Sequence, residues 1–287
     1  MKKLTKSLCL VLALLMIVSI IPMQTQAAPK ISLKSKTVYV GDSFYLKMSG
    51  TTKKVTWSSS NKKVATVNKY GRVTAKKAGK ATIKAKVSSK YYKCTVTVKA
   101  IPTEKDLTWK EYTKHGYFGD STYRYIEVTN NSKETITVKT KSTAYDVDGN
   151  LIGAAESGSE VIGPGCTSLV YEYYDSTTGI VRFDTKFKVE LSNFYISVIE
   201  DLEYTYSDLD GKILMQVTNN GSHRAEFVEA YLLFFKNGEL VNVEEKYFDG
   251  EESCYLYPDE TATEQINLYD DVEYDEIKVF LTGRAYK

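Results

Sequence analysis

Strict alternation of apolar and polar residues is the feature that most constrains this sequence. In residues 80–87, every second side chain is apolar and three of the others are lysines. The apolar positions are Ala81, Ile83, Ala85 and Val87, and the lysines are Lys80, Lys84 and Lys86. A period of two places successive side chains on opposite faces of a strand. Residues 93–99 repeat the pattern around Cys94, which we therefore expect to be a small buried residue of a strand.

Turn residues divide the first hundred positions into many short strands. Gly41, Gly50, Gly71 and Gly79 separate alternating runs within about seventy residues. The chain also holds 23 Tyr but only 5 Pro, a balance that favours strands. These features predict an all-β protein, built as tandem Ig-like β-sandwich domains.

A sharp change in charge divides the chain near residues 101–103. Residues 29–100 contain 18 Lys or Arg and a single acid, Asp42, whereas residues 101–287 contain 17 basic and 35 acidic residues. The formal net charge of the whole chain is only +2. We therefore place a domain boundary at Ile101-Pro102-Thr103, where proline also interrupts strand pairing.

The N-terminus has the three parts of a secretory signal peptide. Lys2, Lys3 and Lys6 precede an apolar run over residues 8–21, which is too short for a comfortable membrane span. Small residues then predict cleavage after Ala27, with Ala28 as the alternative, so residues 1–27 form the predicted signal peptide. No second apolar stretch of membrane-spanning length follows, so we expect an extracellular protein that is secreted or held on the cell surface without a covalent anchor.

An ordered series of motifs in the basic segment resembles the bacterial Ig-like domain, group 2. The series consists of Val55-Thr56-Trp57-Ser58-Ser59-Ser60-Asn61, Val64-Ala65-Thr66-Val67, Gly71-Arg72-Val73-Thr74-Ala75 and Ala78-Gly79-Lys80-Ala81-Thr82-Ile83. The resemblance covers about residues 30–98 and implies a sandwich domain over 28–100, of a kind found in bacterial surface and secreted proteins, often as a spacer. The high lysine content is a departure from the common pattern of that family.

The acidic remainder indicates an internal duplication. Val128-Thr129-Asn130-Asn131 and Val217-Thr218-Asn219-Asn220 lie 89 residues apart, and Gly149 and Gly238 keep that offset. The apolar runs 187–191 and 277–281 continue the series at an offset of 90. We therefore predict two acidic sandwiches, over 103–194 and 195–287, each of which resembles the FxLYD group of extracellular Ig-like domains.

Motifs for catalysis or metal binding are missing from the sequence. His115 and His223 lack a nucleophile or zinc motif around them, and Asp146-Val147-Asp148-Gly149 is better explained as a hairpin turn than as a calcium loop. The acids of 270–276 are interpreted as a solvated run rather than a metal site. We expect no enzyme activity, no catalytic residue, no cofactor and no metal.

The cysteines and clustered tyrosines also favour structural roles. After cleavage three cysteines remain, Cys94, Cys166 and Cys254, an odd number that does not suggest a disulfide framework. The run Tyr171-Glu172-Tyr173-Tyr174 should place Tyr171 and Tyr173 on one face of a strand and Tyr174 on the other. At least one of these faces should therefore pack into a core.

The sequence favours a binding role at the cell surface. Lys80, Lys84 and Lys86 are the predicted polyanion-binding residues, and an anionic cell-wall polymer or acidic polysaccharide is the predicted partner. The charge pattern is equally explained if the lysines neutralise the acidic domains or confer solubility. Specific nucleic acid and membrane partners are not expected, and the sequence carries no signal for an oligomeric state. The alternative function is a carbohydrate-binding or accessory module of an extracellular polysaccharide-handling system.

Overall fold

The computed structural model describes residues 27–287, except for 117–120, 176–178, 210, 251–253 and 269–271. The predicted signal peptide thus lies, but for Ala27, outside the described residues. The regular elements are strands and two short 3₁₀ turns, η1 (Glu104–Asp106) and η2 (Ile199–Asp201), so the prediction of an all-β fold is confirmed. Among the described residues, no helix is long and apolar enough to cross a membrane.

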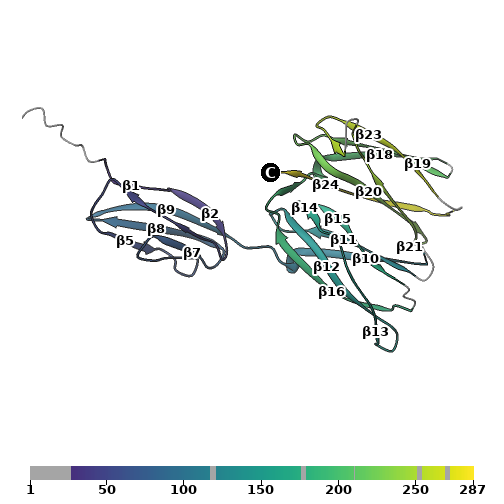
Figure 1. The fold of residues 1–287 in the computed structure, drawn as a ribbon, viewed down its shortest axis with the longest axis horizontal. Coiled ribbons are helices and arrows are strands. Elements are labelled where there is room, and N and C mark those ends of the chain that lie inside the picture. The colour runs from purple at the N-terminus through teal and green to yellow at the C-terminus, as the bar shows by residue number, and fades with distance from the viewer. Residues whose placement is uncertain (1–26, 117–120, 176–178, 210, 251–253, 269–271) are drawn as a thin grey trace, which may run out of the picture. The chain divides into compact units, whose positions relative to one another are not determined.

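The chain divides into two compact units, over Met1–Ala100 and Ile101–Lys287 (Figure 1). Unit 1 contains β1 (Lys30–Ile31), β2 (Ser35–Tyr39), β3 (Ser43–Tyr45), β4 (Met48–Ser49), β5 (Val55–Ser59), β6 (Ala65–Val67), β7 (Arg72–Ala75), β8 (Gly79–Val87) and β9 (Lys90–Lys99). One sheet has the order β2-β9-β8-β5, a second has the order β3-β7-β6, and β1 pairs with β4. The β2–β9 pair is parallel, whereas the other pairs of this unit are antiparallel.

The core of unit 1 follows from the alternation in its strands. Ile83 and Ala85 of β8 and Cys94 and Val96 of β9 are fully buried, and they pack with Val73 of β7 in the other sheet. Cys94 is therefore the small buried residue that its pattern predicted, and burial raises the pKa of its thiol.

Gly71 is needed for the turn that begins the Gly-Arg-Val motif. Its backbone has φ of +81°, and a Cβ atom there would lie 2.3 Å from the carbonyl oxygen of Leu46. Any other residue would clash with the backbone, so this position of the motif is fixed by sterics.

Unit 2 begins with strands that form two sheets. They are β10 (Leu107–His115), β11 (Thr122–Asn130), β12 (Ile136–Tyr145), β13 (Leu151–Glu156), β14 (Glu160–Ile162), β15 (Thr167–Tyr174) and β16 (Arg182–Leu191). One sheet has the order β10-β11-β15, and in the other β12 pairs with β13, β14 and β16. We call this pair of sheets the first sandwich.

The rest of unit 2 repeats this arrangement. Its strands are β17 (Tyr195–Ser197), β18 (Leu202–Leu209), β19 (Lys212–Asn219), β20 (Ala225–Lys236), β21 (Glu239–Tyr247), β22 (Tyr255–Leu256), β23 (Thr261–Asn267) and β24 (Glu276–Tyr286). One sheet has the order β18-β19-β23, and in the other β20 pairs with β21, β22 and β24, with β17 at the edge beside β24. This pair of sheets is the second sandwich.

The same asparagine fixes a corner in each sandwich. The Nδ2 group of Asn130 donates to the carbonyl oxygens of Ile162 and Gly163, both at 3.0 Å, and that of Asn219 donates to the carbonyl oxygen of Leu256 at 2.8 Å. Both asparagines are fully buried. The repeated Asn is thus a structural residue that satisfies backbone carbonyls inside the sandwich.

The predicted alignment of residues 187–191 with residues 277–281, at an offset of 90, has the wrong register. Gly165 N–H donates to the carbonyl oxygen of Asn130, and Asp259 N–H donates to that of Asn219, both at 2.8 Å. Pro164 and Pro258 precede these donors and are therefore equivalent. Their offset is 94, so the strands that follow them are also offset by 94, and not by the predicted 90. The connection between the hairpin glycine and this proline is five residues longer in the second copy. Because the difference of four residues is even, the predicted alignment of 187–191 with 277–281 still kept the correct face of the strand.

The four sheets of unit 2 form successive layers (Figure 1). The β10-β11-β15 sheet of the first sandwich faces the sheet of the second sandwich that contains β20, and Leu169, Tyr231, Leu233 and Phe235 are buried between them. On the opposite face of β20, Leu232 and neighbouring residues fill the core of the second sandwich. Strand β20 is therefore buried on both faces, which explains its continuous apolar run over residues 230–235.

Candidate functional site

The three predicted lysines lie on one face of β8. Lys80 and Lys86 are exposed and Lys84 is partly exposed, whereas Ala81, Ile83 and Ala85 point into the core of unit 1. The sequence alternation thus placed these side chains correctly. Their role in binding stays a prediction.

Strand β9 extends this surface with two lysines that the sequence reasoning missed. In the antiparallel register Lys93 lies directly opposite Lys84, and Thr95 and Thr97 lie opposite Thr82 and Lys80. Lys99 has the same facing as Lys93, and both are exposed. We call the group Lys80, Lys84, Lys86, Lys93 and Lys99 the lysine face. Alternation in residues 93–99 gave the facing of the added lysines, but only the strand register brings them beside those of β8.

The positive charge of the lysine face is not balanced within its own unit. Asp42 is the only acid of residues 29–100, and its carboxylate accepts a hydrogen bond from the backbone N–H of Tyr39 at 2.9 Å. Like charges directly opposite on neighbouring strands repel each other. A polyanion that lies across β8 and β9 would reduce this repulsion and replace diffuse counterions.

Tyrosine rings lie beside two of these ammonium groups. The Nζ atom of Lys86 is 5.6 Å from the ring centroid of Tyr91, and that of Lys99 is 5.8 Å from the ring centroid of Tyr39. A ring at this distance attracts a cation weakly and helps to hold a flexible side chain against the sheet. The lysine face thus combines ammonium groups with threonine hydroxyls and aromatic rings on one flat surface.

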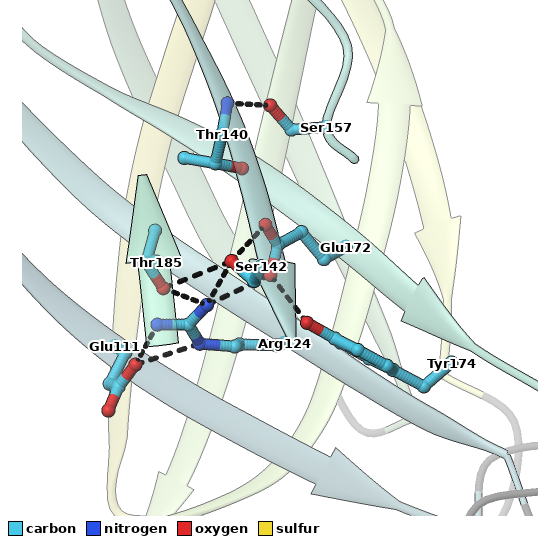
Figure 2. A network of polar contacts seen from close by, with 8 residues as sticks. All are labelled: Glu111, Arg124, Thr140, Ser142, Ser157, Glu172, Tyr174 and Thr185. Atoms are coloured by element: carbon cyan, nitrogen blue, oxygen red, sulfur yellow. Dashed lines mark hydrogen bonds and ion pairs between the residues drawn. The ribbon is translucent and has the colours of Figure 1, made fainter. Parts of the chain in front are cut away.

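A second cluster of charged residues is buried in the first sandwich (Figure 2). Arg124 of β11 is 1% exposed and Glu172 of β15 is fully buried, and their side chains form an ion pair with an Nη1–Oε2 distance of 2.9 Å. Arg124 Nη1 also donates to Ser142 Oγ at 3.0 Å and to Thr185 Oγ1 at 2.8 Å. The other side of the guanidinium pairs with Glu111, whose side chain is 42% exposed.

Both carboxylate oxygens of Glu172 are occupied within the protein. Ser142 Oγ donates to Oε1 at 2.6 Å, and the hydroxyl of Tyr174 donates to Oε2 at 2.9 Å, beside Arg124. Burial and the neighbouring Glu172 raise the pKa of Tyr174. We call Arg124, Ser142, Glu172, Tyr174 and Thr185 the polar core. Its groups satisfy one another, so we assign it to the architecture of the sandwich rather than to substrate chemistry.

The polar core left a signal in the sequence. Arg124 has the same parity in β11 as Ile126 and Val128, both of which are fully buried. An arginine on the apolar face of an alternating strand indicates either a buried ion pair or a break in the strand. Its partner could not be predicted, because Glu172 is 48 residues away in sequence.

The other sequence candidates have structural surroundings. The Asp146 carboxylate accepts hydrogen bonds from the backbone N–H groups of Asp148 at 3.0 Å and Asn150 at 2.8 Å, as in a side-chain-capped turn. Hydrogen bonds from Asn150 lower the pKa of Asp146. His115 Nδ1 lies 2.9 Å from Thr122 Oγ1 across the β10–β11 pair.

The remaining acidic, cysteine and tyrosine candidates are placed as follows. The acidic run 270–276 lies partly outside the described residues. Within the described part of the chain, no group of three or more His, Cys, Asp or Glu is placed to hold a metal ion. Cys94, Cys166 and Cys254 are free thiols. Tyr174 is 2% exposed, whereas Tyr171 and Tyr173 are 40% and 44% exposed on the other face of β15, so the predicted division of these tyrosines is confirmed.

Comparison with known proteins identifies the class of unit 1. Two facing sheets around one core define a β-sandwich, and residues 26–100 match the family model of the bacterial Ig-like domain (group 2). Unit 1 is therefore a bacterial Ig-like domain of group 2, as its motifs predicted. The resemblance of the two acidic sandwiches to FxLYD domains stays a prediction.

The other comparisons add little. No curated protein matches the chain. Among solved structures, it is similar to a crystal structure of Salmonella alpha-2-macroglobulin reacted with methylamine, with 9% sequence identity and a TM-score of 0.20. The match covers 90% of this chain and 23% of that chain. At this TM-score the similarity carries no conclusion about fold or function.

Proposed function

We propose that this chain is an exported bacterial protein that acts in adhesion or surface association, and that its lysine face contacts anionic cell-wall polymers. Three features support export and surface association: the predicted signal peptide of residues 1–27, the group 2 Ig-like domain and the concentration of basic charge in that domain. We further propose a binding role without catalysis.

The observation that carries this proposal is the arrangement of the lysine face. Five lysines lie on one side of the paired strands β8 and β9, in a domain with a single acid. Neighbouring strands are spaced by about 4.8 Å, and residues two apart on a strand by about 6.8 Å, so neighbouring ammonium groups such as those of Lys84 and Lys93 lie close enough to meet one polymer. Wall polymers that carry a repeated phosphate or carboxylate would contact several ammonium groups at once. Lysine is a hydrated point charge, so the contact should be unselective and sensitive to salt.

A sedimentation experiment with purified cell walls tests this role. The chain from Ala28 onward is mixed with walls across a salt series, and bound protein is measured in the pellet. At about 0.3 kcal/mol for each exposed contact, changing all five lysines of the lysine face to Gln should weaken binding about tenfold. Walls from which phosphate polymers have been extracted, and a soluble uronic-acid polymer as competitor, distinguish the two classes of polyanion.

A matched variant separates the lysine face from net charge. Lys53, Lys54, Lys62, Lys63 and Lys77 are exposed residues of the same unit that lie outside β8 and β9. Their change to Gln removes the same total charge and should leave most of the binding. Equal losses in the two variants would show that only net charge matters. Absence of sedimentation by the unaltered chain at low salt would reject polymer binding.

A further inference from the structure

A cavity of about 190 Å³ opens between the two sandwiches of unit 2. Glu160 of β14 lines it from the first sandwich, and Phe227 and Glu229 of β20, Tyr247 of β21 and Arg284 of β24 line it from the second. A volume of this size equals that of about six waters, which is room for one ring-sized ligand. The cavity exists only because the two sandwiches pack together.

A bulge in β20 builds the rim of this cavity. The pairing of β20 with β24 shifts between Glu226 and Glu229, so that Phe227 and Val228 of β20 lie opposite Gly283 of β24 alone. Phe227 has φ of +53° in this bulge and is 49% exposed, whereas the next residue, Val228, is buried in the core. A positive φ is strained for phenylalanine. The corresponding pairing of β12 with β16 in the first sandwich is regular, so this exposed ring is not required by the fold.

Arg284 is held at the cavity by two aromatic rings. Its guanidinium carbon lies 4.8 Å from the ring centroid of Phe227 and 4.4 Å from that of Tyr195. Its Nε atom is buried and has no hydrogen-bond partner among the described residues. Arg284 therefore lines the cavity with a guanidinium held in place by aromatic rings, and its buried Nε–H is a donor without a partner in the described part of the chain.

Glu229 supplies the complementary group. It is 6% exposed, and its Oε2 accepts a hydrogen bond from the hydroxyl of Tyr231 at 2.9 Å. Its Oε1 is buried without a partner in the described part of the chain. Burial and the neighbouring Glu245 of β21 raise the pKa of Glu229 to about 8, so its carboxyl group favours the neutral form at neutral pH, and burial raises the pKa of Glu160 to about 7. An unpaired buried polar atom is costly, and a ligand that pairs with it recovers that cost.

We propose that this cavity binds one neutral sugar residue, with its ring against Phe227 and Tyr247 and its hydroxyls on Glu229 and Arg284. The unpaired carboxyl oxygen of Glu229 needs a donor, and the unpaired Nε–H of Arg284 needs an acceptor. A sugar hydroxyl can serve as either. Tyr247 is 49% exposed, like Phe227, so two aromatic surfaces are available at the rim for the apolar face of a sugar ring. A cationic ligand would be repelled by the guanidinium of Arg284. This site is separate from the lysine face and does not depend on the proposed function.

Ligand titration followed by NMR tests the proposal on the chain from Ala28 onward. The probes are the methyl glycosides of glucose, galactose, mannose and N-acetylglucosamine, with tetramethylammonium and acetate as charged probes. At least one glycoside should bind in the millimolar range and shift resonances of residues that line the cavity. Absence of binding by all four glycosides at 50 mM, or binding of only a charged probe, would overturn the proposal.

Two variants separate binding from folding. Phe227→Gly removes the ring and relieves the positive φ, so glycoside affinity should fall at least tenfold without a fall in Tm. Arg284→Met keeps the stem between the two rings and removes the donor, and we expect a loss of similar size. Tyr204→Ala, at a tyrosine of β18 that is 40% exposed, is the matched control and should leave affinity unchanged. Unchanged affinity in both cavity variants would overturn the proposal even if a glycoside binds elsewhere.

Discussion

The two sandwiches of unit 2 share a strand order and each has an apolar core, but the first carries the polar core at positions that are aliphatic in the second. Counted from the equivalent residues Asn130 and Asn219, Arg124 of the first sandwich corresponds to Ile213 of the second. Counted from Pro164 and Pro258, Glu172 corresponds to Ile266. The count from the prolines also makes Thr185 correspond to Val279. Ser142 pairs with Thr185, and Leu232 pairs with Val279, so Ser142 corresponds to Leu232. All four residues of the second set are aliphatic and belong to its apolar core.

This difference separates what the fold requires from what one copy has acquired. The buried Asn, the hairpin and the proline turn occur in both copies, so they belong to the architecture. The polar core occurs in one copy only, and the other copy shows that aliphatic side chains fill the same positions. A buried ion pair is expensive to desolvate and often adds no net stability over an apolar replacement. We infer that the polar core fixes a unique packing of the first sandwich rather than raising its stability.

The largest expected effect comes from removing one member of the polar core. Glu172→Leu leaves Arg124 buried with its charge only partly compensated, and we expect a loss of about 3–5 kcal/mol in the free energy of unfolding. Trp109 of β10 reports on the first sandwich, and a Trp57→Phe background removes the other tryptophan of the chain. Denaturant unfolding followed by fluorescence gives the value. Ile266→Leu at the equivalent position is the control and should cost less than about 1.5 kcal/mol.

Converting the polar core into the apolar one should have the opposite sign. The variant combines Arg124→Ile, Ser142→Leu, Glu172→Ile, Tyr174→Leu and Thr185→Val, which copies the second sandwich into the first, since Leu268 corresponds to Tyr174 by the same count. We expect the free energy of unfolding to be unchanged or to rise by about 1–4 kcal/mol, because no charge is left unpaired. The same fluorescence measurement checks it. A loss as large as that of Glu172→Leu alone would show that the polar core is required for stability.

The shared asparagine should give similar effects in both sandwiches. Asn130→Ala and Asn219→Ala each leave buried carbonyl oxygens without a donor, and we expect each to cost about 1–3 kcal/mol. Thermal unfolding of the two variants side by side provides the comparison. A large cost in only one sandwich would contradict the equivalence of the two corners.

The last prediction concerns the pH dependence of stability. Because burial raises the pKa of Glu229 to about 8 in the folded state, the folded chain holds a proton that the unfolded chain releases above about pH 4.3. Stability from this group is therefore present at low pH and is lost as the pH rises towards 8, by at most about 1.4 kcal/mol per pH unit. Glu229→Gln should flatten the dependence between pH 5 and 8, measured by denaturant unfolding at several pH values. Part of the slope below about pH 7 should remain, because burial also raises the pKa of Glu160 to about 7, and an unchanged slope would assign the effect to another group.

The prediction that 103–194 and 195–287 fold as separate domains depends on the surface between them. Tyr231, Leu233 and Phe235 of β20 pack against Leu169 of the first sandwich, so a separated second sandwich would expose an apolar face. Exposed apolar patches favour association. Expression of 195–287 alone would show whether the remaining core is sufficient, and this part of the prediction stays open.

Several features followed from the sequence because they depend on neighbours along the chain. Alternation in 80–87 gave the facing of Lys80, Lys84 and Lys86, and the motif around Gly71 gave the class of unit 1. The repeated asparagine gave the duplication at an offset of 89. Such features are local, because a period of two or a forced positive φ is set by a few consecutive residues.

Other features required the tertiary structure, because they join residues that are distant in sequence. The register of β8 with β9 placed Lys93 opposite Lys84, and the packing of sheets paired Arg124 with Glu172. The apolar run of β20 indicated burial, but only the contact between the sandwiches explains why both of its faces are buried. The bulge at Phe227 shifts the core-facing positions of β20 by one residue between Ala225 and Val228. The sequence by itself therefore determined strands, their faces and the family of unit 1. Tertiary structure decided which faces meet, since strand register and sheet packing are set by contacts between distant parts of the chain.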